Sequence, residues 1–261
     1  MSDAPGDEDR RPQIRWLGHA TTLITDRGTT VLTDPVLTAR VAHLRRRRGA
    51  VPTDPEVFTP DVVLLSHLHA DHTHLPSLRK LDAHIPVVVP RRAPDEFPAL
   101  RRVGARLIEV EPGDEVPIGD VVIRVVPADH DGRRWRRGPE RTPALGFVVV
   151  GDATTYFAGD TDLYPDLDDW VRDPDVALLP VGGWGPTLGV GHMDPGRAAI
   201  AAERLGAGTS VPIHFGTLWP IGLDRVRPEM FDGPGAEFVR LADARGVRGV
   251  ELVPGDCLPA G

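Results

Sequence analysis

Short apolar runs rich in β-branched residues open the regular pattern of the chain. They lie at residues 14–17, 21–25 and 29–33, and the turn residues between them are Gly18 and Asp26-Arg27-Gly28. Runs of this length, bounded by glycine and aspartate, are typical of strands that tight turns connect. We therefore predict a β-meander at the start of the fold.

Later apolar runs alternate with segments of helical pattern. Strands are expected at residues 62–65, 86–89, 106–110, 121–126, 145–150, 154–157, 176–180, 209–213 and 250–253, and helices at 75–81, 194–205 and 236–244. The middle helix has Asp194 as its N-cap, Pro195 in its first turn and Gly206 just past its end. Strands in two batches with helices interspersed predict an α/β fold with two sheets, not a doubly wound parallel sheet.

The ends of the chain and its length bear on domain organisation. Residues 1–12 are polar and acidic, so we expect a disordered N-terminal tail and then a single domain at residues 13–261, since no linker or repeat divides them. The tail lacks the apolar segment of a secretory signal, and no run approaches the ~18 apolar residues that span a bilayer. We expect a cytoplasmic protein without a membrane span.

Charge and cysteine content narrow the chemistry. The formal net charge of −8 argues against an extended grip on nucleic acid, which needs many phosphate-neutralising side chains. Cys257 is the only cysteine, so the chain can form neither an internal disulfide nor a thiolate metal cluster. Any metal ion must therefore be held by histidine, aspartate or glutamate. The oligomeric state cannot be inferred from these features.

A dense histidine cluster follows the expected strand at residues 62–65. The segment Ser66-His67-Leu68-His69-Ala70-Asp71-His72 holds three of the ten histidines of the chain and one aspartate. Imidazole and carboxylate together suit Zn²⁺, and Mn²⁺ or Fe is also tolerated. His67 and His69 alternate along an extended segment and point one way, whereas Asp71 and His72 come from the turn that follows. Two adjacent ions can therefore be served.

This segment resembles the metallo-β-lactamase superfamily, whose hallmark is His-x-His-x-Asp-His after a strand. Further matches follow in the expected order, in Pro127-Ala128-Asp129-His130, Phe157-Ala158-Gly159-Asp160-Thr161 and Pro212-Ile213-His214-Phe215-Gly216-Thr217. The resemblance covers residues 14–256. It implies an αβ/βα sandwich, with two mixed sheets flanked by helices and the site at their edge.

The resemblance also implies two divalent ions per chain, with zinc the first expectation. By carry-over, His67, His69 and His130 hold the first ion, Asp71, His72 and His214 hold the second, and Asp160 bridges them. A hydroxide between two such ions is a nucleophile near neutral pH. Asp71 is a candidate to orient that water or to shuttle its proton.

Two departures and three minor motifs refine the resemblance. Aspartate at position 160, where the best-known zinc β-lactamases have cysteine, argues against β-lactamase activity, and the full ligand set argues against a single-iron persulfide dioxygenase. Similarity to the branch with N-acylphosphatidylethanolamine-hydrolysing phospholipase D and the ascorbate 6-phosphate lactonases rests on Trp16-Leu17-Gly18-His19-Ala20-Thr21, Thr33-Asp34-Pro35 and Gly191-His192-Met193-Asp194-Pro195. Both kinds of enzyme act on substrates that bear a phosphate.

Several polar residues near the motifs have open roles. Asp34 either accepts a hydrogen bond from a ligand histidine or forms an ordinary Asp-Pro turn. His192 lies just before a helix N-terminus that favours anions. It either binds substrate or protonates the leaving group, or it has no catalytic role. His19 is interpreted as structural. Surface placement is expected for His43, His74 and His84.

Two arginine clusters raise the question of an anionic substrate. One comprises Arg45 to Arg48, and the other Arg133, Arg134, Arg136 and Arg137. The second begins three residues after His130, so Arg133 and Arg134 are constrained to lie near the metal ions and are expected to steer an anionic substrate. The alternative is a solvated loop.

The resulting hypothesis is a metal-dependent hydrolase of a small anionic ester, such as a phosphodiester or phosphorylated lactone. A thioesterase or lactonase for a substrate without phosphate is the enzymatic alternative. A non-catalytic metal-binding sensor or scaffold, or a redox protein with iron, would be of another class. Metal content and a substrate panel separate these readings.

Overall fold

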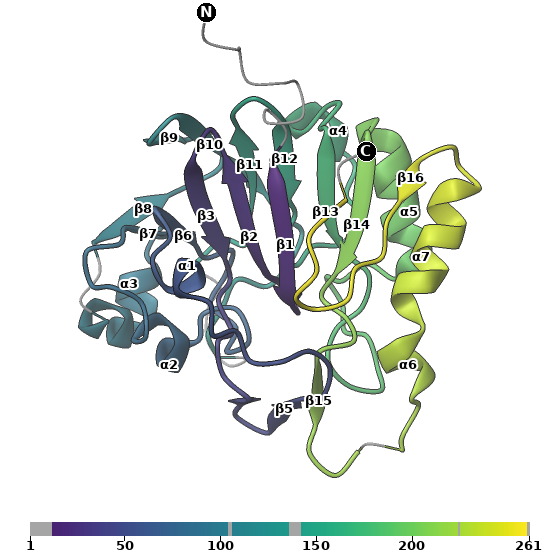
Figure 1. Ribbon diagram of the computed structural model, residues 1–261, viewed down its shortest axis with the longest axis horizontal. Coiled ribbons are helices and arrows are strands. Elements are labelled where there is room, and N and C mark those ends of the chain that lie inside the picture. The colour runs from purple at the N-terminus through teal and green to yellow at the C-terminus, as the bar shows by residue number, and fades with distance from the viewer. Residues whose placement is uncertain (1–11, 104–105, 136–141, 224, 260–261) are drawn as a thin grey trace, which may run out of the picture.

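The first half of the chain builds a six-stranded sheet in the computed structural model, which describes residues 12–103, 106–135, 142–223 and 225–259 (Figure 1). In spatial order its strands are β1 (Gln13–Gly18), β2 (Thr21–Asp26), β3 (Thr29–Thr33), β6 (Val62–Leu64), β7 (Val87–Pro90) and β8 (Leu107–Val110). β1 to β3 form an antiparallel meander, as predicted, and β3, β6, β7 and β8 run parallel. Residues 1–11 of the expected tail lie outside the described residues.

The second half builds a seven-stranded mixed sheet. In spatial order its strands are β16 (Arg248–Gly249), β14 (Thr209–Ile213), β13 (Val176–Pro180), β12 (Thr154–Phe157), β11 (Leu145–Val150), β10 (Val121–Pro127) and β9 (Glu115–Ile118). β12, β13, β14 and β16 run parallel, whereas β9 to β12 pair antiparallel. The predicted fold of two sheets is therefore confirmed.

The two faces of the first sheet bury different apolar sets, because side chains alternate along a strand. Val62 and Leu64 of β6 belong to the core between the sheets, whereas Val63 and Leu65 join a smaller outer core. That outer core is covered by α1 (Pro55–Phe58), α2 (Leu75–Leu78), α3 (Ala93–Glu96) and a 3₁₀ turn over Pro98–Arg102. Strands buried on both faces explain the continuous apolar runs of the sequence.

Helices of the second half cover the outer face of the second sheet (Figure 1). They are α4 (Leu167–Trp170), α5 (Pro195–Leu205) and α7 (Pro234–Asp243), and the short α6 (Glu229–Asp232) precedes α7. The Asp194 carboxylate caps α5 by accepting a hydrogen bond from the Arg197 N–H at 2.9 Å, and Gly206 ends the helix with φ +66°. These caps are the predicted ones. Within the described residues no helix is long and apolar enough to cross a membrane.

A third, three-stranded sheet lies beneath one edge of the sandwich (Figure 1). It comprises β15 (Leu218–Pro220), β5 (Leu44–Arg46) and β4 (Arg40–Val41), in that order. The sequence pattern does not predict this sheet, because β5 overlaps the cluster Arg45 to Arg48, which has the composition of a charged loop. Its apolar face buries Val41, Leu44 and Leu218 in a small cluster of their own.

The predicted strand at residues 250–253 is wrong. The structure has the two-residue β16 just before these residues, and beyond the Val250 N–H, which donates to Ser210 O, the chain leaves that sheet. It crosses to the first sheet, where the backbone of residues 255–258 bonds to Trp16 and Ile14 of β1. Apolar residues at 250–253 therefore form a connection between the two sheets.

Candidate metal centre

The carboxyl ends of several strands meet at one edge of the sandwich, and the candidate ligands lie in the loops that follow them. The segment 66–72 follows β6, and His130 follows β10. Asp160 and His214 follow β12 and β14, which run parallel. Parallel strands deliver the residues after their carboxyl ends to the same edge of a sheet, which is where α/β folds place their ligands.

Three imidazoles form the first donor group. His67 Nε2 lies 2.9 Å from His69 Nδ1, which lies 3.1 Å from His130 Nε2. Nitrogen ligands that surround one tetrahedral zinc ion are about 3.3 Å apart, as follows from Zn–N bonds of about 2.0–2.1 Å. The spacing of the three nitrogens therefore suits one shared ion.

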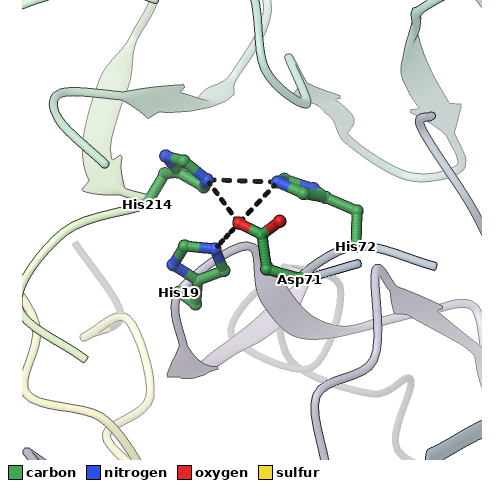
Figure 2. Close-up of side chains that lie close together, drawn as sticks. All are labelled: His19, Asp71, His72 and His214. Carbon is green, nitrogen blue, oxygen red and sulfur yellow. Dashed lines mark hydrogen bonds and ion pairs between the residues drawn. The ribbon is translucent and has the colours of Figure 1, made fainter. Parts of the chain in front are cut away.

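The second donor group converges on the Asp71 carboxylate (Figure 2). Asp71 Oδ2 lies 3.6 Å from His72 Nε2 and 3.8 Å from His214 Nε2, and these two nitrogens are 3.1 Å apart. His19 approaches the same oxygen from the other side. The three residues assigned to a second ion are thus adjacent in space, although His214 is far from the other two in sequence.

Asp160 lies between the two donor groups. Its Oδ2 is 3.1 Å from His72 Nε2, 3.9 Å from His67 Nε2 and 4.0 Å from His130 Nε2, while its Oδ1 is 3.2 Å from His214 Nε2. The side chain is buried, and Oδ1 has no hydrogen-bond partner within the described residues. A buried carboxylate oxygen without a donor is costly unless a cation satisfies it. The donor set therefore fits a pair of divalent ions.

Hydrogen bonds on the outer side of the rings orient the ligand nitrogens. His130 Nδ1–H donates to Gly191 O at 2.8 Å, and His214 Nδ1–H donates to Gly182 O at 3.0 Å. With Nδ1 protonated, Nε2 presents a lone pair to the centre, which is the form that binds a metal. His130 Nε2 thus faces His69 Nδ1, and His214 Nε2 faces His72 Nε2, each pair at a distance that a shared metal ion would accommodate.

One buried carboxylate, Asp34, organises a ligand from each group. Its Oδ2 accepts a hydrogen bond from His72 Nδ1–H at 2.6 Å and another from the Ser66 hydroxyl at 2.5 Å. Ser66 Oγ in turn lies 3.0 Å from His67 Nδ1, and the Ser66 N–H donates to Asp34 Oδ1 at 2.8 Å. Asp34 therefore acts directly on His72 and, through Ser66, on His67.

Neutral imidazoles and buried carboxylates make up the charge pattern of the centre. Burial lowers the pKa of His67 well below its usual value and that of His130 to about 4, so both rings are neutral. Burial also opposes the charged form of His72, but the carboxylates of Asp160 and Asp34 outweigh it and raise the pKa of His72 well above its usual value. The carboxylates of Asp160 and Asp34 thus favour positive charge at this position, which suits a bound cation.

His19, which the sequence analysis interpreted as structural, contacts the centre directly. Its Nε2–H donates to Asp71 Oδ2 at 2.8 Å, and its ring centroid is 4.0 Å from that of His214. Its backbone carbonyl accepts a hydrogen bond from the His214 N–H at 2.9 Å, and its N–H donates to Thr217 Oγ1 at 2.9 Å. His19 therefore ties Asp71 to the His214 loop, and the short motif around residue 19 was its only sequence signal.

We expect replacement of His19 by leucine to weaken binding of an ion at the second donor group and to leave binding at the first group unchanged. The variant loses the N–H that fixes Asp71, and loss of such an orienting partner typically costs 10- to 100-fold in metal affinity. His19→Gln keeps a side-chain N–H and should recover most of the loss. Cobalt titration followed by visible absorption measures the two binding steps. Equal weakening of both steps, or a glutamine variant no better than leucine, would contradict this role.

The arginines after His130 do not lie equivalently. Arg133 pairs with Asp131, with Nη2 2.6 Å from Oδ2, whereas Arg134 Nη1 donates to Leu68 O at 3.0 Å and to Thr73 O at 2.9 Å. Arg134 thus braces the ligand loop and also lines the cavity. Arg136 and Arg137 lie outside the described residues. In the other cluster, Arg46 donates to the Leu17 and Val36 carbonyls.

The remaining histidines differ in how far their positions match the sequence predictions. His192 Nε2 lies 3.3 Å from Asp160 Oδ2 and its side chain lines the cavity. The helix N-terminus expected to favour an anion near His192 is that of α5. Its N-cap is the Asp194 carboxylate, which supplies the negative charge there. His43 and His84 are exposed, as expected. The expected surface placement of His74 is wrong, because its ring is buried against Ser77 Oγ at 2.7 Å, at the start of α2.

A cavity of about 600 Å³ opens onto both donor groups. Its lining comprises His43, His69, Ala70, Asp71, Arg134, Asp160, Gly183, Trp184, Gly185, Pro186, Thr187, Leu188, Gly189, His192 and His214. Cavities of this size accept small organic molecules. A substrate in this one would lie against the candidate ligands, so the geometry supports chemistry at the metal centre.

Comparisons with known proteins agree with this geometry. A family model described as a beta-lactamase superfamily domain matches residues 29–215. A UPF0173 metal-dependent hydrolase of Koribacter versatilis is 33% identical over 220 residues, covering 78% of this chain and 84% of the relative. Another, of Thermoplasma acidophilum, is 30% identical over 227 residues, covering 84% and 88%.

Solved structures show the same fold. The metallo hydrolase Igni18 of Ignicoccus hospitalis superposes with a TM-score of 0.69 at 21% identity, covering 95% of this chain and 97% of that one. An isothiocyanate hydrolase from Delia radicum gut bacteria superposes with a TM-score of 0.70 at 19% identity, covering 95% and 99%. The family model and the sequence relatives place the chain in the metallo-β-lactamase superfamily, as a member of its UPF0173 family of metal-dependent hydrolases.

Proposed function

We propose that this metal-dependent hydrolase is dinuclear and cleaves a small anionic ester, such as a phosphodiester or phosphorylated lactone. The observation that carries the proposal is Asp160, whose buried carboxylate lies between two converging donor groups. His67, His69 and His130 would hold one ion, and Asp71, His72 and His214 the other. Two divalent ions, zinc first among them, would activate water and polarise the bond under attack.

The residues around the ligands would assist this chemistry. Asp71 projects between His72 and His214, where it would orient the attacking water. Burial opposes protonation of His192, but hydrogen bonding and attraction to Asp160 outweigh it and raise the pKa of His192. A protonated His192 on the cavity wall would donate a proton to the leaving group. Arg134 would attract the anionic part of the substrate.

Resemblance to the branch with the phospholipase D and the ascorbate 6-phosphate lactonases supports a phosphate-bearing substrate, and the assignment to that branch is part of the proposal. A cytoplasmic location and a single catalytic domain at residues 13–261 stay predictions. The core between the sheets supports the domain prediction, because it joins residues from Ile14 to Leu252.

The proposal predicts two equivalents of divalent metal per chain. Elemental analysis of protein purified without added metal, and then titrated with zinc or manganese, measures the stoichiometry. A bis-aryl phosphodiester, a lactone, a thioester and a β-lactam then serve as substrates, with chelator-treated protein as the control. Saturation at one equivalent, with His72 and His214 unligated in a crystal structure, would defeat the dinuclear assignment.

A lactonase or thioesterase acting on a substrate without phosphate is the second candidate. The observation in its favour is that Arg134 is the only arginine or lysine in the described cavity lining, and part of its guanidinium is bound to the ligand loop. Faster cleavage of the lactone or thioester than of the phosphodiester would select it. Two bound ions without turnover of any substrate would instead indicate a metal-binding sensor.

The two arginines separate the anionic-substrate proposal into testable parts. We expect Arg134→Gln to raise KM for an anionic ester about 3- to 10-fold, with a smaller change for a neutral ester. Arg133→Gln is the matched control, because Arg133 pairs with Asp131 and is not in the cavity lining. The effect should shrink at 1 M salt, where the screening length falls to ~3 Å. Equal responses of both esters would remove the anionic inference.

A further inference from the structure

The cavity has a second wall that takes no part in metal binding. It comes from the loop between β13 and α5, with one residue from the ligand segment, and comprises Ala70, Trp184, Pro186 and Leu188. All four are half-buried, so each presents apolar surface to the cavity. Apolar surface lining a concave site is what binds the apolar part of a small ligand.

The third sheet supports this wall. Trp184 and Ala70 pack against the buried cluster of Val36, Val41, Leu44 and Leu218, which β4, β5 and β15 contribute in large part. The imidazole of His43, from the turn between β4 and β5, meets the Trp184 ring edge-on with centroids 5.1 Å apart. An indole held by packing on one side and an edge contact on another is a preformed surface.

The wall is continuous with the metal centre at Gly183. A Cβ at this position would lie 3.7 Å from Leu188 Cδ1 and 3.9 Å from His214 Cε1. A candidate ligand and the apolar wall are therefore separated by about the width of one methyl group. A substrate whose reacting bond lies at the ligands has its adjoining group against Leu188 and Trp184.

The charges of the lining restrict what that group is. Asp71 and Asp160 are the only carboxylates among the described residues of the lining, and both belong to the donor groups. Outside those groups the charged or polar side chains are Arg134, His43, Thr187 and His192, and none of them carries a negative charge. A cationic substituent would find no counter-charge there, whereas a neutral apolar group would replace water against the wall.

We propose that the wall of Ala70, Trp184, Pro186 and Leu188 binds an aromatic or alkyl group of the substrate, which is therefore an ester with an apolar portion and no cation. The proposal rests on the proposed function, because it takes the reacting bond to lie at the metal centre. It adds the chemical class of the group next to that bond.

Alkylphosphonates test whether the wall binds an alkyl group. In the proposed centre the phosphonate would bind at the ions in every case, so only the alkyl group varies. Calorimetry on the zinc-loaded protein measures the affinities for methylphosphonate and hexylphosphonate. We call the ratio of the second affinity to the first the chain-length gain. Each fully buried methylene contributes up to about fourfold in affinity. We expect hexylphosphonate to bind at least tenfold more tightly than methylphosphonate to the wild type.

Variants locate the source of this gain. Trp184→Ala should reduce the chain-length gain below threefold and leave the affinity for methylphosphonate unchanged. Trp184→Phe should keep most of the chain-length gain. Trp170→Ala is the matched control, because Trp170 is a partly exposed tryptophan of α4 outside the cavity lining. If Trp184→Ala does not fold, Leu188→Ala decides by the same measurement. A full gain in these cavity variants, or no gain in the wild type, overturns the proposal.

A parallel assay separates this proposal from the proposed function. Hydrolysis of 4-nitrophenyl acetate and hexanoate is followed in the same variants. A phosphonate chain-length gain that depends on Trp184, without hydrolysis of any ester, supports the wall and contradicts the hydrolytic assignment to esters. Hydrolysis without any chain-length preference, in binding or in kcat/KM, leaves the proposed function standing and overturns the wall.

Discussion

Asp160→Ala is expected to reduce kcat at least 100-fold and to lower bound metal from two ions to one or fewer. The carboxylate faces both donor groups, with Oδ2 3.9 Å from His67 Nε2 of the first and Oδ1 3.2 Å from His214 Nε2 of the second. In the proposed dinuclear centre its loss would leave the two ions without a shared anion. Even the loss of a hydrogen-bonding partner outside the ligand shell typically lowers metal affinity or activity 10- to 100-fold. Steady-state kinetics and elemental analysis of the dialysed variant measure both effects.

Asp162→Ala is the control for this variant. Asp162 is two residues away, and its carboxylate pairs with Arg197 at 2.6 Å. We expect it to retain two ions and wild-type kcat. An Asp160→Ala variant with full activity and two ions would show that the bridging assignment is wrong, whatever the other ligands do.

The candidate ligands were readable from the sequence because their signal is local. The segment 66–72 and the residues His130, Asp160 and His214 each follow an apolar run, and such runs are also what predicts strands. A strand followed at once by a metal-binding side chain gives both the element and the position of the ligand at its end. The strands were predicted from these runs, and the ligand set was assigned to the residues after them through the resemblance to the metallo-β-lactamase superfamily.

Residues that act through tertiary contacts were not readable in this way. His19 contacts Asp71, which is 52 residues away, and no periodicity or composition marks such a pair. The third sheet has the same origin, since β5 pairs with the distant β15 and carries Arg45 and Arg46, which a strand pattern disfavours. Chain-distant pairing is set by packing that local patterns do not encode.

Backbone conformation adds a feature that the sequence did not show. His19, Asp34 and His214 all have positive φ, at 55°, 32° and 61°. Non-glycine residues in this region cost free energy and persist only where their surroundings hold them. Each of the three makes a hydrogen bond that orients a candidate ligand, so three of the eight non-glycine residues with positive φ in the described part of the chain lie at the candidate centre.

The second large effect is expected at Asp34. Asp34→Asn keeps the size of the side chain but presents its N–H₂ or its single oxygen to two donors, His72 Nδ1–H and the Ser66 hydroxyl, which both use Oδ2. Because Ser66 also contacts His67, the disturbance reaches one ligand of each ion. We expect both ions to bind 10- to 100-fold more weakly, in contrast to the selective effect at His19.

Metal titration and thermal unfolding distinguish this mechanism from general damage. Asp34 is fully buried, and each donor left unpaired costs about 1–3 kcal/mol, so the metal-free variant should melt at a lower temperature than the wild type. Excess zinc should restore much of the loss by binding the folded state. Asp61→Asn is the control, because Asp61 also accepts two hydrogen bonds, from Thr30, but at an exposed site. Weaker binding of the ion at His72 alone would show that Ser66 does not relay the effect of Asp34 to His67. The proposed coupling of the two donor groups through this carboxylate would then be wrong.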